Sequence, residues 1–209
     1  MNLTANAVLI FGLLSLPLAA STVNIDFGKP SAGFVQGTST SATYTFAPGF
    51  SVIASGYNGS VTASTPQTLA ALYAKTNGGD EQGLGLAAGT DREITPGHFI
   101  QLDLSQLNGF GASSFKLGID SSTPPDAYAL YLSNIKGVAG TLFATGTGET
   151  SYSVSRSQFA VNPYLTLTAT NGNVLVGPGT VTSAPEPGTM FSLGAGLLLA
   201  GWRLRKLKS

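Results

Sequence analysis

A two-residue alternation of apolar and polar side chains recurs through the middle of the chain, and it restricts the possible folds more than any other feature. Ile100, Leu102 and Leu104 alternate with polar residues. The same spacing returns in three later sets: Phe115, Leu117 and Ile119; Tyr128, Leu130 and Leu132; and Leu165, Leu167 and Ala169. Because successive side chains of a strand point to opposite faces, each set predicts a strand with one buried face. We therefore expect Leu102 in the core and Gln101 on an exposed face.

Short clusters of turn-forming residues separate these segments. They are Asn58-Gly59, Asn77-Gly78-Gly79, Asn108-Gly109, Pro124-Pro125-Asp126 and Asn171-Gly172. Asn-Gly pairs favour the tight turns of hairpins, so Asn171-Gly172 predicts a hairpin that joins residues 164–170 to 173–176. Residues 22–184 show no sustained helical periodicity. The fold class that we predict for residues 22–176 is all-β, an antiparallel β-sandwich of roughly ten short strands with a jelly-roll-like arrangement.

Charge and composition exclude several functional classes. Residues 22–184 contain six basic and nine acidic residues, whereas nucleic-acid binding needs clustered lysine and arginine. The chain has no cysteine and a single histidine, His98. Thiol catalysis, iron–sulfur clusters, cysteine-based zinc sites and clustered imidazole sites are therefore excluded.

The N-terminal segment is typical of a secretory signal peptide. An apolar run over residues 8–16 is followed by Pro17 and then by the small residues Ala19, Ala20 and Ser21. An apolar segment, a helix breaker and a small-residue cleavage site occur in this order in secretory signals. We expect residues 1–21 to form this signal helix and cleavage to follow Ala20 or Ser21.

The C-terminal segment has the composition of a short membrane anchor. Residues 190–202 carry no charge, and the basic residues Arg203, Arg205, Lys206 and Lys208 follow. A helix from Gly188 to Leu204 would rise about 25 Å, against roughly 30 Å of hydrocarbon, and basic side chains can reach the headgroups from there. We predict a linker over residues 177–187, then a short transmembrane helix and a basic tail over 188–209, with the tail on the cytoplasmic side.

The same C-terminal residues resemble a known family of sorting signals. Pro185-Glu186-Pro187, the short apolar segment with glycines and the arginine-rich end together are similar to the PEP-CTERM sorting signal. Ala184 stands where valine is usual. The resemblance implies an exported protein of an exopolysaccharide-producing bacterium with a Gram-negative type of envelope. It also implies processing by an exosortase, a membrane-embedded cysteine protease.

The middle of the chain loosely resembles the uncharacterised β-sandwich that often precedes this signal. The residues that carry the likeness lie at 80–86, 92–94 and 100–105. This resemblance implies a fold and no chemistry.

A cluster of carboxylates is the main candidate for a metal site. Asp80, Glu81, Asp91 and Glu93 lie close together in the sequence, and calcium takes six to eight oxygen ligands. The alternative is an ordinary solvated loop. A glycosidase would need two carboxylates at a defined separation, which the sequence does not give.

Three further patterns have a functional and a structural interpretation. The glycine-rich stretch 83–88 matches a dinucleotide pattern but lacks a preceding strand, so a glycine-kinked strand is favoured. His98 could act as a base, but no Gly-x-Ser-x-Gly motif occurs, so an exposed histidine at the start of a strand is favoured. The aromatic residues Tyr44, Phe46, Phe50 and Tyr57 could stack on sugars, although alternating aromatics usually lie in a core.

These observations lead to one expectation and one rival. We expect a non-enzymatic protein that is tethered to the inner membrane before processing and then belongs to the cell surface or extracellular matrix, associated with exopolysaccharide. The rival is a secreted carbohydrate-binding module or polysaccharide hydrolase that uses the same sorting route. We predict no catalytic residues, and no cofactor other than the calcium considered above.

Overall fold

The strands that the structure describes all lie within Thr22–Ser183. The computed structural model describes residues 20–76, 81–183 and 194. The predicted signal helix and transmembrane helix lie outside these residues, apart from Ala20, Ser21 and Gly194, and stay predictions. Within the described ranges, no helix has both the length and the hydropathy that a membrane crossing requires.

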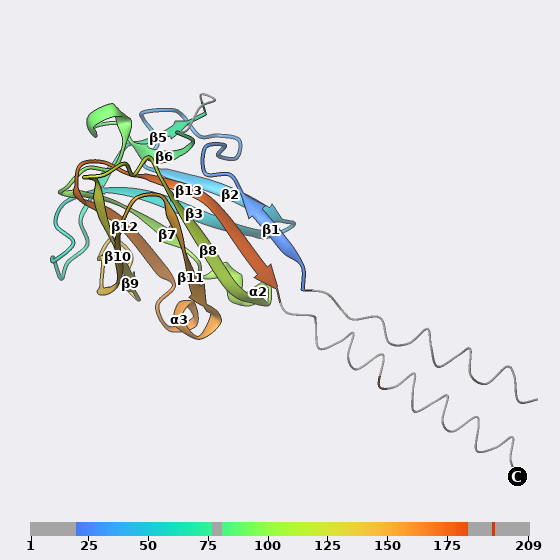
Figure 1. Cartoon of the computed structure of the whole chain (residues 1–209). Coiled ribbons are helices and arrows are strands. Elements are labelled where there is room, and N and C mark those ends of the chain that lie inside the picture. The colour runs from blue at the N-terminus through green and yellow to red at the C-terminus, as the bar shows by residue number, and fades with distance from the viewer. Residues whose placement is uncertain (1–19, 77–80, 184–193, 195–209) are drawn as a thin grey trace, which may run out of the picture. The chain divides into compact units, whose positions relative to one another are not determined.

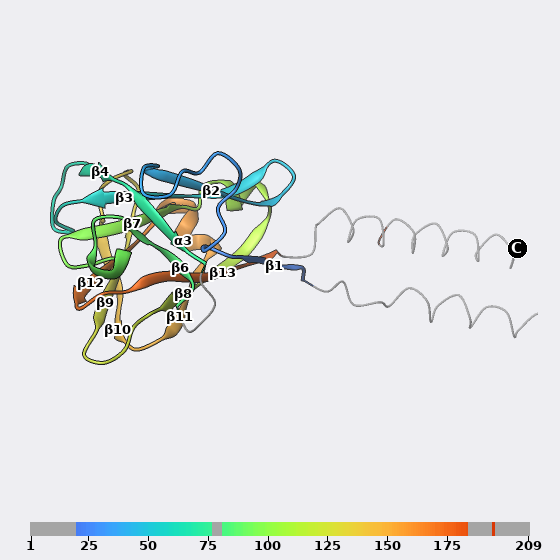
Figure 2. The same ribbon diagram turned by 90° about the horizontal axis from the view of Figure 1, so that it is seen from above.

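Two antiparallel sheets face each other and form a β-sandwich-like domain (Figures 1 and 2). The six-stranded sheet has the order β11-β8-β13-β6-β5, with β1 paired to β13. Its strands are β1 (Thr22–Ile25), β5 (Leu72–Lys75), β6 (Gly83–Leu86), β8 (Ala112–Asp120), β11 (Thr150–Ser155) and β13 (Leu175–Ser183). The predicted all-β class and antiparallel pairing are confirmed, while the jelly-roll arrangement stays a prediction.

The seven-stranded sheet has the order β10-β9-β12-β7-β3-β2, with β4 paired to β3. Its strands are β2 (Ser41–Ala47), β3 (Phe50–Asn58), β4 (Thr68–Ala70), β7 (His98–Asp103), β9 (Ala127–Ser133), β10 (Thr141–Thr147) and β12 (Tyr164–Asn171). Strand β7 runs between β3 and β12, and β12 also pairs with β9. The central strands of this sheet are therefore hydrogen-bonded along both edges.

Three short helical turns connect the strands, and they are η1 (Thr90–Arg92), α2 (Gln106–Gly109) and α3 (Arg156–Val161). At the start of α3, the backbone N–H of Ser155 donates to Gln158 Oε1 over 2.8 Å. A serine followed three residues later by glutamine is a recognised helix-start pattern, so the sequence did contain a signal for this helix.

The core lies between the inner faces of the two sheets. Phe115 and Leu117 of β8 are fully buried, as are Ile100 and Leu102 of β7. The alternation predicted these inward-facing side chains, and the structure confirms them. Burying them removes apolar surface from water, which is the main stabilising contribution in a domain of this size.

The outer face of β7 is not exposed, which corrects the prediction for Gln101. This side chain is only 2% exposed. Its Nε2 donates to the carbonyl of Val138 over 3.0 Å, and its Oε1 accepts from the backbone N–H of Gly137 over 2.7 Å. A loop between β9 and β10 thus covers this face of the sheet. The residue pattern within β7 cannot predict this, because the loop lies in a different part of the sequence.

The predicted hairpin at Asn171-Gly172 is wrong. Strand β12 belongs to the seven-stranded sheet and β13 to the six-stranded sheet, so the turn carries the chain from one sheet to the other. Both edges of β12 are already paired with β7 and β9. No edge is left for β13, so the local turn does not lead to local pairing.

The domain ends later than predicted. Residues 177–183, assigned from the sequence to a linker, form most of β13. The register of β13 against β8 shifts between Val176 and Gly179, which is a bulge at Pro178. Proline lacks an N–H and is tolerated in a sheet at such bulges. The strand then continues to Ser183, which pairs with Ala112.

Candidate functional site

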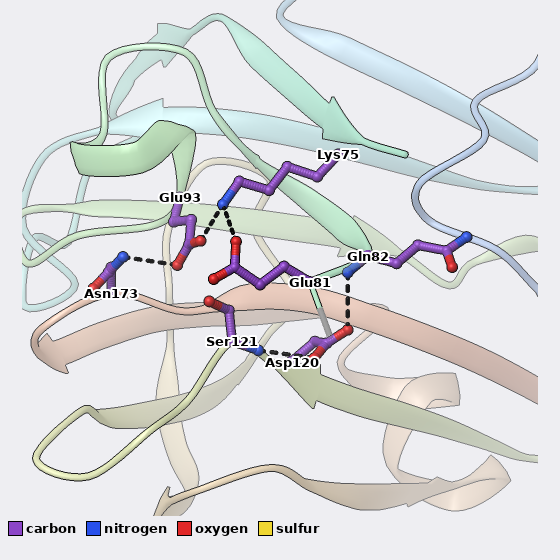
Figure 3. Close-up of polar contacts among 7 residues, drawn as sticks. All are labelled: Lys75, Glu81, Gln82, Glu93, Asp120, Ser121 and Asn173. Atoms are coloured by element: carbon purple, nitrogen blue, oxygen red, sulfur yellow. Dashed lines mark hydrogen bonds and ion pairs between the residues drawn. The ribbon is translucent and has the colours of Figure 1, made fainter. Parts of the chain in front are cut away.

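A buried glutamate gathers polar side chains from three distant segments (Figure 3). Lys75 Nζ donates to Glu93 Oε1 and, over 2.9 Å, to Glu81 Oε2. On the other side, Asn173 Nδ2 donates to Glu93 Oε2 over 2.8 Å. The isolated bridge between Ile94 and Val174 sets the neighbouring residues Glu93 and Asn173 beside each other. We call these four residues the Glu93 network.

Charge pairing keeps the Glu93 network stable in a buried position. The Glu93 side chain is 1% exposed and the Lys75 side chain 15%. A buried carboxylate needs an opposite charge and hydrogen bonds, and Lys75 and Asn173 supply them. Burial alone would lower the pKa of Lys75, but its hydrogen bonds to Glu81 and Glu93 outweigh burial and raise this pKa. The lysine is therefore held in its charged form.

The structure does not bring together all four carboxylates of the calcium hypothesis. Glu81 and Glu93 do approach each other, with the ammonium of Lys75 between them. Asp91 is exposed in η1, and Asp80 lies outside the described residues. In the part of the chain that the structure describes, no group of three or more acidic or histidine side chains is placed to hold a metal ion. The calcium site stays a prediction.

Beside this network lies an open pocket of about 600 Å³. Its lining residues are Asn24, Ile25, Asp26, Gln82, Asp120 and Pro178. Gln82 joins its two acidic residues, because its backbone N–H donates to Asp120 Oδ2 over 3.3 Å and its Nε2 donates to Asp26 Oδ2 over 2.9 Å. Figure 3 shows Gln82 and Asp120 close to the Glu93 network.

Sequence reasoning missed this pocket. Asn24 and Asp26 come from the start of the domain, Gln82 from the segment before β6, and Asp120 from the end of β8. No motif links them, because the sheet order β8-β13-β6 and the pairing of β1 with β13 bring them together. No local sequence pattern could therefore have predicted that these residues form a pocket.

The glycine-rich stretch and the single histidine have structural roles. Residues 83–86 form β6, and a side chain at Gly83 or Gly85 would overlap the backbone of Val176 or Arg92. The favoured interpretation as a glycine-containing strand is thus confirmed. His98 is the first residue of β7, as predicted, but it is half-buried rather than exposed, and its Nδ1 lies 3.1 Å from Thr95 Oγ1.

The aromatic residues considered for sugar stacking are largely inside the domain. Tyr44 and Tyr57 are each 3% exposed. The hydroxyl of Tyr44 donates to the carbonyl of Phe27 over 2.9 Å. Phe46 and Phe50 are half-buried and both pack against the ring of Phe110, with centroids 5.0 and 5.3 Å away. The two tyrosines therefore present no face to a ligand.

Comparison with known proteins gives one match, at the C-terminal end. No curated protein and no solved structure is significantly similar to the chain. Residues 183–206 match the family model of the PEP-CTERM protein-sorting motif. The chain carries a PEP-CTERM sorting motif. This confirms the resemblance that Pro185, Glu186 and Pro187 indicated.

The PEP-CTERM motif implies a protein that is exported and sorted to the cell surface by an exosortase. The match covers only this short segment, so it says nothing about what the folded domain binds. It begins at Ser183, which is also the last residue of β13.

Proposed function

We propose that the protein is an exported, non-enzymatic component of the cell surface or extracellular matrix that associates with exopolysaccharide. The C-terminal segment tethers it to the inner membrane until an exosortase-type protease processes the PEP-CTERM motif. The residues for this sorting step are Pro185, Glu186 and Pro187, and the basic residues that anchor the cytoplasmic end are Arg203, Arg205, Lys206 and Lys208.

The match of residues 183–206 to the PEP-CTERM sorting motif is the observation that carries this proposal. The pairing of β1 with β13 adds to it, because it sets the two ends of the domain beside each other. Thr22 pairs with Thr182 in antiparallel register, and the two strands lie side by side in Figures 1 and 2. The signal segment 1–21 and the sorting segment are therefore attached to neighbouring strand ends.

The rival function, a carbohydrate-binding module or hydrolase, is favoured by one observation. The open pocket beside the Glu93 network contains two carboxylates and two amides, which are groups that bind sugar hydroxyls. These hydrogen-bonding groups support the proposed association with exopolysaccharide.

Two sets of variants in an exosortase-containing host test the sorting proposal. Glu186→Ala alters the recognised tripeptide and leaves the apolar segment unchanged, so processing is expected to stop while membrane insertion continues. Replacing Arg203, Arg205, Lys206 and Lys208 with glutamine is expected to weaken retention and orientation instead, since each cation near an anionic leaflet contributes about 1 kcal/mol. Immunoblots of membrane and released fractions distinguish the two effects. Normal processing of Glu186→Ala would contradict the proposal.

A further inference from the structure

The pocket between β1, β8 and the segment before β6 offers hydrogen-bond donors and acceptors side by side. Thr180 Oγ1 donates to Asn24 Oδ1 over 3.2 Å. Across residues 20–76 and 81–183, no protein group pairs with the Nδ2 of Asn24 or the Oε1 of Gln82. One amide therefore keeps donors for a ligand and the other keeps an acceptor.

The two carboxylates are held in place by the backbone and keep lone pairs free. Asp120 Oδ1 accepts from the backbone N–H of Ser121 over 2.9 Å and its Oδ2 accepts from Gln82 N. Asp26 Oδ1 accepts from the backbone N–H of Gly28 over 2.9 Å. Each carboxylate oxygen can accept a further hydrogen bond. The acceptors are thus oriented before a ligand arrives, which reduces the entropy lost on binding.

The charges in the pocket discriminate between classes of ligand. Asp26 pairs with the exposed Lys29 over 2.8 Å, while Asp120 has no lysine or arginine partner within the described ranges. The remaining negative charge repels polyanions such as uronate polymers. A hard cation such as calcium needs oxygen ligands, and the N–H donors of Asn24 do not meet that need. A sugar hydroxyl both donates and accepts, so it matches the mixed set.

The pocket also has an apolar part that suits a sugar ring. Ile25 and Pro178 belong to its lining, and Pro178 stands exposed at the bulge of β13. A volume of about 600 Å³ falls within the range of small-molecule sites. Carbon–hydrogen faces of a sugar can pack on such side chains while its hydroxyls reach the carboxylates and amides.

We infer that this pocket binds uncharged, hydroxyl-rich sugar residues of a neutral polysaccharide. The inference rests on the proposed function and deepens it, because it gives the association with exopolysaccharide a site and a ligand class. Asn24 donates to sugar hydroxyls, Gln82 and Asp120 accept from them, and Asp26 holds Gln82 in position.

Calorimetric titration of the full-length chain tests the inference. The protein is kept in a sugar-free zwitterionic detergent and titrated with the neutral oligosaccharides cellohexaose, maltohexaose and mannohexaose, and with hexagalacturonate as the charged probe. At least one neutral hexasaccharide is expected to bind in the millimolar range or tighter, and hexagalacturonate is not. In the double variant Asn24→Ala, Asp120→Asn, affinity is expected to fall about tenfold or more, because a charge-assisted hydrogen bond and a donor are lost.

A matched control places the same kind of change outside the pocket. Asp91→Asn also converts a carboxylate to an amide, at an exposed position that does not line the pocket, and it is expected to leave binding unchanged. Three results would overturn the inference: no neutral probe binds, only hexagalacturonate binds, or the double variant binds as tightly as the wild type. Since the titration involves no processing, such a result leaves the sorting proposal intact.

Discussion

Gln101 and Glu93 are both buried polar side chains, and they are held in different ways. Gln101, on the seven-stranded sheet, is neutral and bonds to backbone groups of the loop at Gly137 and Val138. Glu93, next to the six-stranded sheet, is an acid that depends on the charge of Lys75. Neutral hydrogen bonds hold the loop that covers Gln101. An ion pair holds Glu93, which lies near the open pocket.

This difference indicates where a functional surface can lie. The loop over Gln101 leaves no opening at the centre of the seven-stranded sheet, since Thr166 and Thr168 are buried there too. The six-stranded sheet instead exposes Asn24, Gln82 and Pro178. A neutral network contributes stability at every pH, whereas a charged network is sensitive to pH and to loss of one partner.

The largest effect is expected for Lys75→Met. This variant leaves Glu93 buried without its cation, and breaking a buried ion pair costs about 3–5 kcal/mol against a total stability of roughly 5–15 kcal/mol. Denaturant unfolding measures the loss. Lys29→Met is the control, because the exposed pair of Lys29 with Asp26 contributes at most about 1 kcal/mol. Equal losses in the two variants would show that the buried ion pair of Glu93 contributes no more than the exposed pair of Asp26.

The second effect concerns Gln101. Gln101→Leu leaves the N–H of Gly137 and the carbonyl of Val138 without their partner, which is expected to lower stability by about 2–3 kcal/mol. Gln101→Asp is expected to lower it further, because a charge is also buried. Thermal unfolding measures the stability of the wild type and of both variants, and it is expected to fall in the order wild type, Gln101→Leu, Gln101→Asp. If Gln101→Asp leaves the stability unchanged, position 101 is exposed, as the alternation predicts.

Alkaline pH is expected to destabilise the domain through side chains whose protonated form is favoured by folding. Burial raises the pKa of Tyr44 and of Tyr128, and hydrogen bonds to two glutamates raise that of Lys75. Above pH ~10 the unfolded chain therefore binds fewer protons than the folded one, and stability falls as pH rises. Urea unfolding between pH 9 and pH 12 is expected to show a shallower fall of the unfolding free energy in Tyr44→Phe and in Lys75→Met than in the wild type. If it falls equally steeply in all three proteins, the raised pKa values are not the cause.

The smallest effect is expected for calcium. In the wild type, the ammonium of Lys75 already lies between Glu81 and Glu93, so melting curves in millimolar calcium and in chelator are expected to differ by about one degree or less. In Lys75→Met the two carboxylates lose that cation, and calcium is expected to raise the melting temperature. A shift of several degrees in the wild type, abolished by Asp80→Asn with Glu93→Gln, would instead establish the carboxylate site.

The sequence predicted what depends on local pattern. Alternation identified β7, β8, β9 and β12 and oriented Leu102 and Phe115 toward the core, because strand geometry links spacing to face. It did not predict the burial of Gln101, since the covering loop comes from a different part of the chain. The Asn171-Gly172 turn was recognised as a turn, yet the partner of each strand depends on which sheet edges remain free.

The candidate site depended almost wholly on tertiary contacts. Glu81 and Glu93 are neighbours in the sequence, but the contacts of Glu93 with Lys75 of β5 and with Asn173, which lies between β12 and β13, depend on the fold. The sorting motif is the opposite case. A protease reads it as a linear segment, so Pro185, Glu186 and Pro187 could be recognised without any knowledge of the fold.

The intact mass of the protein recovered from its own host tests the central claim most directly. Removal of both signals predicts a product that begins at residue 21 or 22, retains the folded domain 22–183 and lacks the apolar segment and basic tail of residues 190–209. In a host without exosortase, the tail is expected to remain. A mass that corresponds to residues 1–209, or a tail that is lost equally in both hosts, would contradict the account.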